Sequence, residues 1–465
     1  MATGDTGAGP AQNLLLHFSR NGAFLSGSRL LVLERGEGPY VFDREGRRYI
    51  DGLSSLFCSQ LGYSFGPEFA AVASRQINLL PFNTNWATAH PPAIELASEL
   101  ARRAPLDDAR VFFTCGGSEA VETAWKLVRQ FHLANGEPQR TKAIARDVAY
   151  HGVTLGALSF TGVEKFKQPF GPAPVQTRHV SNTNRFRDEC PEEEQCANLL
   201  YEIDAAIRFE GPETVAMIIA EPVQNAGGCL TPPAGYWQGL REIADRYGAV
   251  LVADEVITGM GRLGSWFGSE RYDARPDVIT IAKGLTSAYA PMGATLLSSR
   301  IAEPLYRENE TLLHGITFGG HPVSAAIALR NLELFEEHEI LANVLQLEGH
   351  LRERMEGLLE LPIVGDVRGA GFFWAAELVK DAGNSRFDAA ERERLLRGFM
   401  PERLLEAGLI ARADDRGDSV VQVAPPLNCT AAELDEVVDA LGETLADAGE
   451  FMGLTAVGET STVTR

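Results

Sequence analysis

Two charged side chains that follow two apolar runs are the first candidates for chemistry in this sequence. Asp254 follows the run at 249–253, and Lys283 follows the run at 278–282. Short apolar runs bounded by Gly and Pro are typical of buried strands in a parallel sheet. Because ligands bind beyond the carboxyl ends of such strands, we expect the carboxylate and the amine to face one crevice.

An amine and a carboxylate in one apolar crevice are the two groups that pyridoxal 5′-phosphate requires. Desolvation lowers the pKa of a lysine, which favours a Schiff base with an aldehyde. The carboxylate can face the pyridinium nitrogen. Gly284, next to Lys283, lets the backbone approach a ligand closely. Strands also end in charged residues where the chain simply reaches water, so this function needs a phosphate site elsewhere in the chain.

Gly117 and Ser118 are candidates for that phosphate site. They lie between an apolar run at 111–114 and a helical pattern that reaches residue 131. At a helix N-terminus, backbone N–H groups, the Ser118 hydroxyl and the helix dipole can bind a phosphate. A serine N-cap in a tight turn explains the same residues without a ligand. Thr317, in a second Gly-rich loop, can offer another hydroxyl and N–H.

Four further candidates follow expected strands or lie in a loop. Tyr150 and His151 come after the strand at 142–148, where an aromatic side chain can stack on a flat ring. A purely structural role is the alternative for both, and for His151 the two interpretations fit equally well. Glu221 follows the strand at 214–220 and can accept a hydrogen bond or hold an arginine. Phe57 lies in a Gly- and Ser-rich loop, where it can line a ligand or pack beneath the loop.

Strands and helices alternate from residue 111 to 283, which predicts an α/β fold with a doubly wound, mostly parallel sheet. A hairpin near residues 31–51 and the strands at 408–413 and 419–423 predict a smaller α+β unit at the chain ends. The segment at 162–196 is interpreted as irregular, and its acidic run as a solvated surface.

The domain boundaries follow from these patterns. Residues 12–65 and 325–458 are expected to form the small α+β domain, and residues 66–324 the large cofactor-binding domain. Residues 1–11 and 459–465 are rich in small and polar residues, so we expect them to be disordered.

The composition disfavours several classes of function. The chain has 465 residues and a formal net charge of −21, which disfavours nucleic acid or an anionic membrane as a partner. The six cysteines show no spacing typical of a metal site, so we expect free thiols and no metal. No signal peptide or membrane span is recognisable, and we expect a cytoplasmic protein.

Taken together, the motifs resemble those of the class III, or ω-amino acid, aminotransferases, which are pyridoxal-phosphate enzymes of fold type I. They occur in order along nearly the whole chain, and within the family the amine:pyruvate and β-alanine:pyruvate transaminases are most similar. The motifs are DGLSSLFCSQLGY, GGSEAVETA, AYHG, AEPVQ, DEVITGMGRLG, AKGL, TFGGHP and APPL. The resemblance implies a large domain with a mostly parallel seven-stranded sheet flanked by helices, and a smaller domain built from both termini.

The resemblance also implies roles for single residues. Lys283 would form the Schiff base with the cofactor and then carry the proton, while Asp254 would keep the pyridine nitrogen protonated. The other residues implied to bind the cofactor are Gly117, Ser118, Tyr150, His151, Glu221, Val256 and Thr317. Tyr150 and Val256 would sandwich the ring, and Thr317 would come from the other subunit of an obligate homodimer.

The substrate side is implied less specifically. Arg412 falls where the family places a mobile arginine that binds a carboxylate or swings away, although a strand residue facing water is the alternative. Phe57 replaces a tryptophan that is common in the family, and Asn225 replaces a glycine. We expect both changes to affect substrate choice. The residues expected to contact substrate are Phe57, Trp86, Tyr150 and Arg412.

The function implied is the transfer of an amino group from an amine or ω-amino acid to pyruvate or a similar 2-oxo acid, by a ping-pong mechanism. A decarboxylase or aminomutase of the same fold is the first alternative. A non-catalytic protein that uses the fold as a scaffold is the second, and the presence of both Lys283 and Asp254 argues against it.

Overall fold

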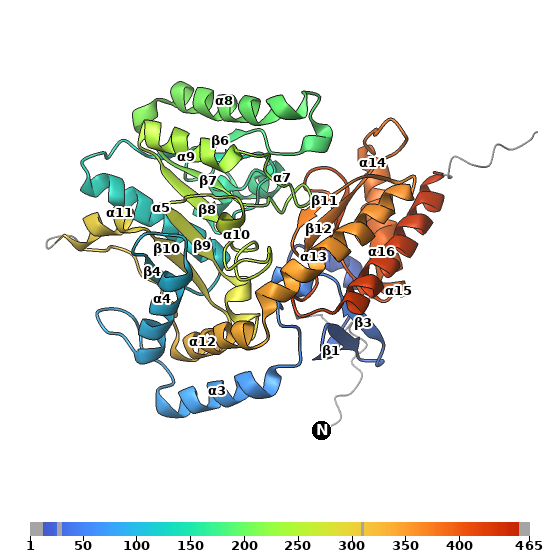
Figure 1. Ribbon diagram of the computed structural model, residues 1–465, viewed down its shortest axis with the longest axis horizontal. Coiled ribbons are helices and arrows are strands. Elements are labelled where there is room, and N and C mark those ends of the chain that lie inside the picture. Colours follow the sequence, from blue (N-terminus) through green and yellow to red (C-terminus); the bar gives the residue numbers. More distant parts are fainter. Residues whose placement is uncertain (1–12, 26–29, 308–310, 455–465) are drawn as a thin grey trace, which may run out of the picture.

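The structure is a computed structural model that describes residues 13–25, 30–307 and 311–454 (Figure 1). The two termini expected to be disordered, 1–11 and 459–465, lie outside the described residues. None of the helices in the described part of the chain combines the length and the apolar character needed to cross a bilayer.

A seven-stranded sheet forms the centre of the molecule, which confirms the predicted α/β fold. Its order is β4-β10-β9-β8-β7-β5-β6, and only β10 runs antiparallel to its neighbours. The strands are β4 (Arg110–Thr114), β5 (Lys142–Arg146), β6 (Thr177–Val180), β7 (Val215–Ala220), β8 (Val250–Asp254), β9 (Val278–Ile281) and β10 (Gly293–Leu297). All residues of β7, β8, β9 and β10 are buried, as expected for strands covered on both faces.

Helices cover both faces of this sheet (Figure 1). Alternate residues of a strand point to opposite faces, so Ile218 and Leu251 pack in one core while Met217 and Val252 pack in the other. The first face carries α4 (Pro91–Arg103), α8 (Glu192–Glu210), α9 (Tyr236–Tyr247) and α12 (Pro322–Glu337). The second carries α5 (Gly117–Ala134), α6 (Leu155–Phe160) and α11 (Ser299–Ala302).

The N- and C-terminal segments of the chain share a separate core, and Figure 1 shows the blue strands β1 and β3 beside the red C-terminal helices. One sheet has the order β1-β2-β3-β13, and another has the order β11-β12-β15-β14. The strands are β1 (Leu33–Glu37), β2 (Tyr40–Asp43), β3 (Arg48–Asp51), β11 (Val364–Ala370), β12 (Phe373–Leu378), β13 (Leu409–Ile410), β14 (Arg412–Asp414) and β15 (Val420–Val423). The domain boundaries themselves stay a prediction.

The remaining helices connect these sheets or cover them. The longer ones are α3 (Gly66–Leu79), α13 (Ile340–Glu356), α15 (Met400–Glu406) and α16 (Ala431–Met452). The short ones are α1 (Asn21–Leu25), α2 (Ser54–Phe57), α7 (Glu164–Lys167), α10 (Gly268–Arg271) and α14 (Ala389–Arg392).

Two sequence-based interpretations of secondary structure were wrong. The segment taken as irregular, 162–196, contains strand β6 at the sheet edge, and its acidic run opens helix α8. Acidic residues in a first helical turn are favoured by the helix dipole, so this run is a start signal for a helix. The expected strand at 408–413 is divided at Ala411 between β13 and β14, which belong to different sheets.

Candidate active site

A cavity of about 370 Å³ lies beyond the carboxyl ends of β5, β7, β8 and β9. It is the crevice in which ligands bind in open α/β sheets. Every residue assigned to the site from the sequence lines it, except Trp86 and Thr317. The residues that meet here are Phe57, Gly117, Ser118, Tyr150, His151, Glu221, Asp254, Val256, Lys283 and Arg412.

Asp254, the last residue of β8, is a buried carboxylate held by three groups. Its Oδ2 lies 2.7 Å from Nδ1 of His151, and its Oδ1 accepts hydrogen bonds from the Thr280 hydroxyl (3.1 Å) and the Val256 N–H (3.2 Å). The Nε2 atom of His151 is buried without a partner among the described residues. These contacts fix a carboxylate that can accept a hydrogen bond from a protonated ring nitrogen in the cavity.

Lys283 follows β9 and enters the same cavity in a backbone conformation that is rare for a side-chain-bearing residue. Its φ is +43°, and such strain is common at functional sites. A Cβ on the neighbouring Gly284 would lie 2.1 Å from Oε1 of Gln60, so a larger residue there would displace the buried Gln60 side chain. Burial lowers the pKa of Lys283, although the neighbouring Cys58, Asp254 and Glu221 partly oppose this effect. A fraction of free amine is thereby available at lower pH than for an exposed lysine.

The start of α5 forms an anion cradle. Gly116 is the N-cap residue, and it provides no side-chain hydrogen bond to the helix. The Ser118 Oγ accepts a hydrogen bond from the Val153 N–H (3.1 Å), so its own proton is available to a ligand. Ser118 is therefore not the N-cap that the ligand-free alternative required. A Cβ on Gly117 would lie 2.8 Å from Cγ1 of Val256, so the glycine permits close packing at this point.

Glu221, after β7, holds the backbone of the site. One carboxylate oxygen accepts a hydrogen bond from the Tyr150 N–H (3.3 Å), and the other accepts one from the Asn225 N–H (3.0 Å). Burial raises the pKa of Glu221. The Arg146 guanidinium donates to the Glu221 backbone carbonyl (2.6 Å). Direct contact between the Glu221 side chain and the cofactor stays a prediction.

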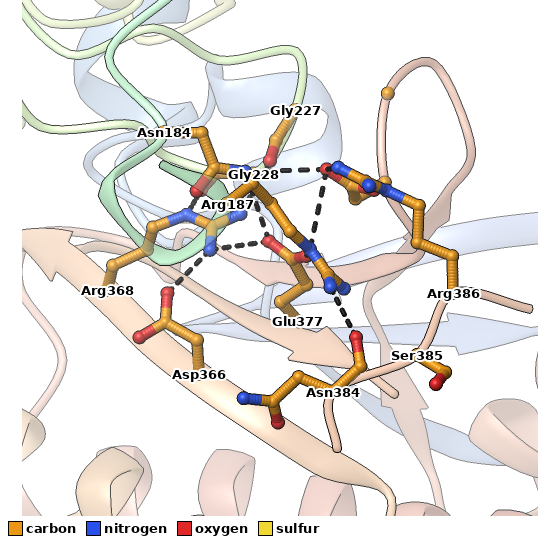
Figure 2. A network of polar contacts seen from close by, with 12 residues as sticks. Asn184, Arg187, Gly227, Gly228, Asp366, Arg368, Glu377, Asn384, Ser385 and Arg386 are labelled. Carbon is orange, nitrogen blue, oxygen red and sulfur yellow. Dashed lines mark hydrogen bonds and ion pairs between the residues drawn. The ribbon is translucent and has the colours of Figure 1, made fainter. Parts of the chain in front are cut away.

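A turn at 225–228 connects the cavity to the sheet that contains β11 and β12. The Arg368 guanidinium donates to the carbonyls of Gly227 (2.7 Å) and Gly228 (2.6 Å), and its Nη1 lies 2.7 Å from Glu377 (Figure 2). Glu377 is fully buried and also accepts a hydrogen bond from Arg187 (2.5 Å). This buried network fixes the turn that carries Asn225.

The far wall of the cavity carries two arginines. Arg412 and Arg416 both line it, and Asp414 lies between them in sequence. Burial, together with repulsion from Arg416, lowers the pKa of Arg412 to about 10, so it stays charged near neutral pH. The sequence interpretation found Arg412 but missed Arg416 and Asp414. For Asp414 the spacing R-A-D was an available signal, because residues i and i+2 of a strand share a face, whereas Arg416 lies beyond the end of β14.

Trp86 and Thr317 lie away from the cavity of their own chain. The Trp86 ring packs against Gly315, where an added Cβ would lie 2.8 Å from the indole. Trp86 is 61% exposed and lines a second hollow with Leu312 and Leu313. Thr317 is exposed in the same loop. Their roles in binding stay predictions.

The cavity fits pyridoxal 5′-phosphate. A basic amine, a buried carboxylate with an unpartnered His151 nitrogen behind it, and a helix N-terminus with a free hydroxyl proton meet in one space. These are the donors and acceptors that an aldehyde, a pyridinium and a phosphate require. Lys283, Asp254 and Ser118 with Gly117 would hold these three parts, and Tyr150 and Val256 would flank the ring.

Comparison with known proteins gives a consistent result. The family model described as aminotransferase class-III matches residues 24–445. Probable aminotransferase Rv3329 of Mycobacterium tuberculosis is 49% identical over 442 residues, which cover 94% of each chain.

Two solved structures are also similar to the whole chain. An (S)-enantioselective ω-transaminase from Thermomicrobium roseum has a TM-score of 0.89 at 38% identity, and the match covers 94% of this chain and 96% of that one. The ω-transaminase of Pseudomonas jessenii in complex with PMP has a TM-score of 0.88 at 34% identity, and the match covers 95% and 98%.

Proposed function

The chain belongs to the class-III aminotransferases, and on this basis we propose that it transfers an amino group from an amine or an ω-amino acid to pyruvate or a similar 2-oxo acid. As a member of that family it is a pyridoxal-phosphate enzyme with an amine donor and an oxo-acid acceptor. The choice of substrates is supported by a cavity with aromatic walls, Phe57, Tyr150 and Phe166, and a guanidinium at one side.

When bound, pyridoxal 5′-phosphate supplies an aldehyde that carries the amino group and a protonated ring that withdraws electrons from the reacting carbon. The Asp254 carboxylate keeps a proton on the ring nitrogen, and His151 and Thr280 keep that carboxylate in place. The Nζ atom of Lys283, once it is a free base, moves a proton at the substrate carbon. Burial favours this form because it disfavours the charged amine.

Arg412 is proposed to bind the carboxylate of the oxo acid. A guanidinium forms two parallel hydrogen bonds with a carboxylate. Arg412 has no hydrogen bond from its side chain in the described part of the chain, and Asp414 lies 3.8 Å from its Nε. An arginine with so few fixed contacts can also move aside for an amine without a carboxylate. The Phe57 ring centre lies 5.9 Å from Nζ of Lys283, so Phe57 would then contact the apolar part of the amine substrate.

The observation that carries this proposal is the meeting of Lys283, Asp254 and Arg412 in one cavity. The test is to incubate purified holoenzyme with simple amines and ω-amino acids without an acceptor, and then to add pyruvate. We expect the matching carbonyl product first and alanine after the addition. A Lys283→Ala variant should form neither, whereas Lys380→Ala, at an exposed ion pair, should behave as wild type. Release of CO₂ or a shifted amino group would instead identify a decarboxylase or an aminomutase, and failure to bind the cofactor would favour a scaffold.

We also infer that a second copy of this chain covers the exposed apolar surface near Thr317. Leu313 (87% exposed), Trp86 and Phe318 lie on or beside this loop. Apolar surface of this kind commonly marks an interface, and Thr317 would then reach the cavity of the partner. Light scattering after size exclusion should give the mass of a dimer. Leu313→Asp should reduce it to a monomer, while Leu359→Asp, at another exposed leucine, should not. A wild-type monomer would refute the inference.

A further inference from the structure

Three charged side chains, Arg412, Asp414 and Arg416, follow one another at every second residue beside the cavity; the two arginines line it, and Asp414 does not. Arg412 and Asp414 are the first and last residues of β14, so their side chains share a face of the strand. Arg416 follows in the turn, and its guanidinium lies 5.7 Å from the Tyr150 ring centre. Arg412 and Arg416 both line the cavity.

Asp414 is bound by Arg416 much more closely than by Arg412. It accepts hydrogen bonds from Nε of Arg416 (2.6 Å), from Nη2 of Arg416 and from the Arg416 backbone N–H (3.0 Å). The shortest approach of Arg412 to the same carboxylate is 3.8 Å, which is too long for a hydrogen bond. Asp414 and Arg416 are both buried, so their attraction is little weakened by water.

The charges of this wall leave one positive charge for a ligand. The pair Arg416 and Asp414 is neutral, and Arg412 makes only a longer ion contact of 3.8 Å with the same carboxylate. The next acidic residue, Asp415, is already bound by Lys165 (2.9 Å) and Arg397 (2.6 Å). The remaining charged or titratable groups that line the cavity come from other segments of the chain; they are Lys283, Asp254, Glu221, Tyr150, His151 and His17. The wall therefore offers one guanidinium to a carboxylate.

We propose that Asp414 and Arg416 are specificity-determining residues, which restrict this wall to a 2-oxo acid with one carboxylate and exclude one with two. The proposal rests on the function proposed above. A monocarboxylate neutralises Arg412. A second carboxylate would have to bind Arg416, whose charge is already neutralised by the buried Asp414 outside the cavity lining, and the two like charges would repel each other in a water-poor site.

Asp414 keeps its charge under all ordinary assay conditions. Burial opposes ionisation, but Arg416 and then Arg412 outweigh it and lower the pKa of Asp414 to about 2. The exclusion of dicarboxylates should therefore not depend on pH between about 6 and 9.

The main test compares pyruvate with 2-oxoglutarate as acceptor for one amine donor. Wild-type holoenzyme should have a kcat/KM for pyruvate at least about tenfold higher than for 2-oxoglutarate. A tenfold difference corresponds to about 1.4 kcal/mol, which the repulsion between two neighbouring unit charges away from bulk water readily supplies. Asp414→Asn removes the competing charge and should move the ratio toward 2-oxoglutarate by at least about tenfold. Asp415→Asn, which removes the neighbouring carboxylate outside the cavity, should leave the ratio unchanged.

A binding measurement separates this proposal from the function proposed above. Calorimetric titration of holoenzyme with propionate and with glutarate needs no turnover, and wild type should bind propionate more tightly. Arg416→Gln frees Asp414 to pair with Arg412, so it should weaken propionate binding by about tenfold. Equal use of both oxo acids by wild type, or an unchanged acceptor ratio in a folded Asp414→Asn enzyme, would overturn the proposal. If neither oxo acid reacts, the proposed function fails. The calorimetric comparison of propionate with glutarate then still tests whether the wall admits one carboxylate and excludes two.

Discussion

Replacing Glu377 by glutamine should destabilise the protein strongly, because its fully buried carboxylate pairs with two largely covered arginines, Arg187 and Arg368, in the network of Figure 2. Glu377 is 0% exposed on β12 and also accepts a hydrogen bond from Asn184 (3.3 Å). The glutamine keeps the shape of the side chain. The substitution removes the negative charge, and it turns the N–H donors of the new amide toward the N–H donors of the neighbouring side chains.

The magnitude follows from what the two arginines retain. Loss of one partner of a buried ion pair costs about 3–5 kcal/mol. Arg368 keeps Asp366 (2.6 Å) and two backbone carbonyls, and Arg187 keeps the Asn384 carbonyl, so the lower end of that range applies. For a chain of this length the unfolding entropy is about 1 kcal/mol/K, so a loss of about 3 kcal/mol lowers the Tm by about 3 °C.

Differential scanning calorimetry of Glu377→Gln and wild type, both with and without cofactor, would measure this effect. The matched control is Glu333→Gln, because Glu333 is an exposed partner of an arginine (Arg330, 2.8 Å) and such pairs contribute about 0–1 kcal/mol. Its Tm should change by less than about 1 °C. A Glu377→Gln shift as small as that of the control would show that the network does not hold the turn at 225–228.

Two other predictions concern the cavity. Gly117→Ala places a Cβ 2.8 Å from Cγ1 of Val256, so the cofactor Kd, measured by fluorescence titration, should rise by at least about tenfold. Gly349→Ala, with nothing within 4 Å of its Cβ, should leave the Kd unchanged. Equal cofactor affinities of the two variants would contradict the role of Gly117 in the anion cradle. The pKa of Lys283 is lowered by burial, so the rate at which the cofactor-free enzyme forms a Schiff base with pyridoxal 5′-phosphate should rise with pH and level off below the usual lysine range near 10.4. Arg412→Gln removes a nearby positive charge, so it should move this pH limb of cofactor binding to higher pH, and an unmoved limb would contradict the assignment of Lys283 as the titrating group.

The central sheet was predictable because its strands carry their own signal. The run VAMIIA of β7 and the run VLVAD of β8 are buried throughout, and short apolar runs of this kind are typical of strands that are covered on both faces. The residues that end these strands, Glu221 and Asp254, therefore had to face one edge of the sheet. For this reason the part of the cavity around Glu221, Asp254 and Lys283 could be predicted from the sequence.

The edge of the sheet and the substrate wall could not be predicted in the same way. Strand β6 reads TRHV, and its stability comes from backbone pairing with β5, which leaves little trace in side-chain pattern. The division of the chain at Ala411 depends on two partners, β3 and β15, that are distant in sequence. Arg416 lies in a turn, so only the fold shows that it reaches Tyr150.

The replacement of a glycine by Asn225 joins these two ends of the cavity. The Asn225 N–H donates to Glu221, at the cofactor end. Its backbone carbonyl (2.7 Å) and its side-chain Oδ1 (3.2 Å) both accept from the Gln422 amide, and Gln422 on β15 is paired directly with Arg412 on β14. A glycine would keep the backbone contacts but lose the Oδ1 contact and gain conformational freedom. Asn225 therefore links the backbone beside Glu221 to the strand pair that carries Arg412, so the backbone of the proposed carboxylate-binding wall is held in place while the Arg412 side chain stays free to move.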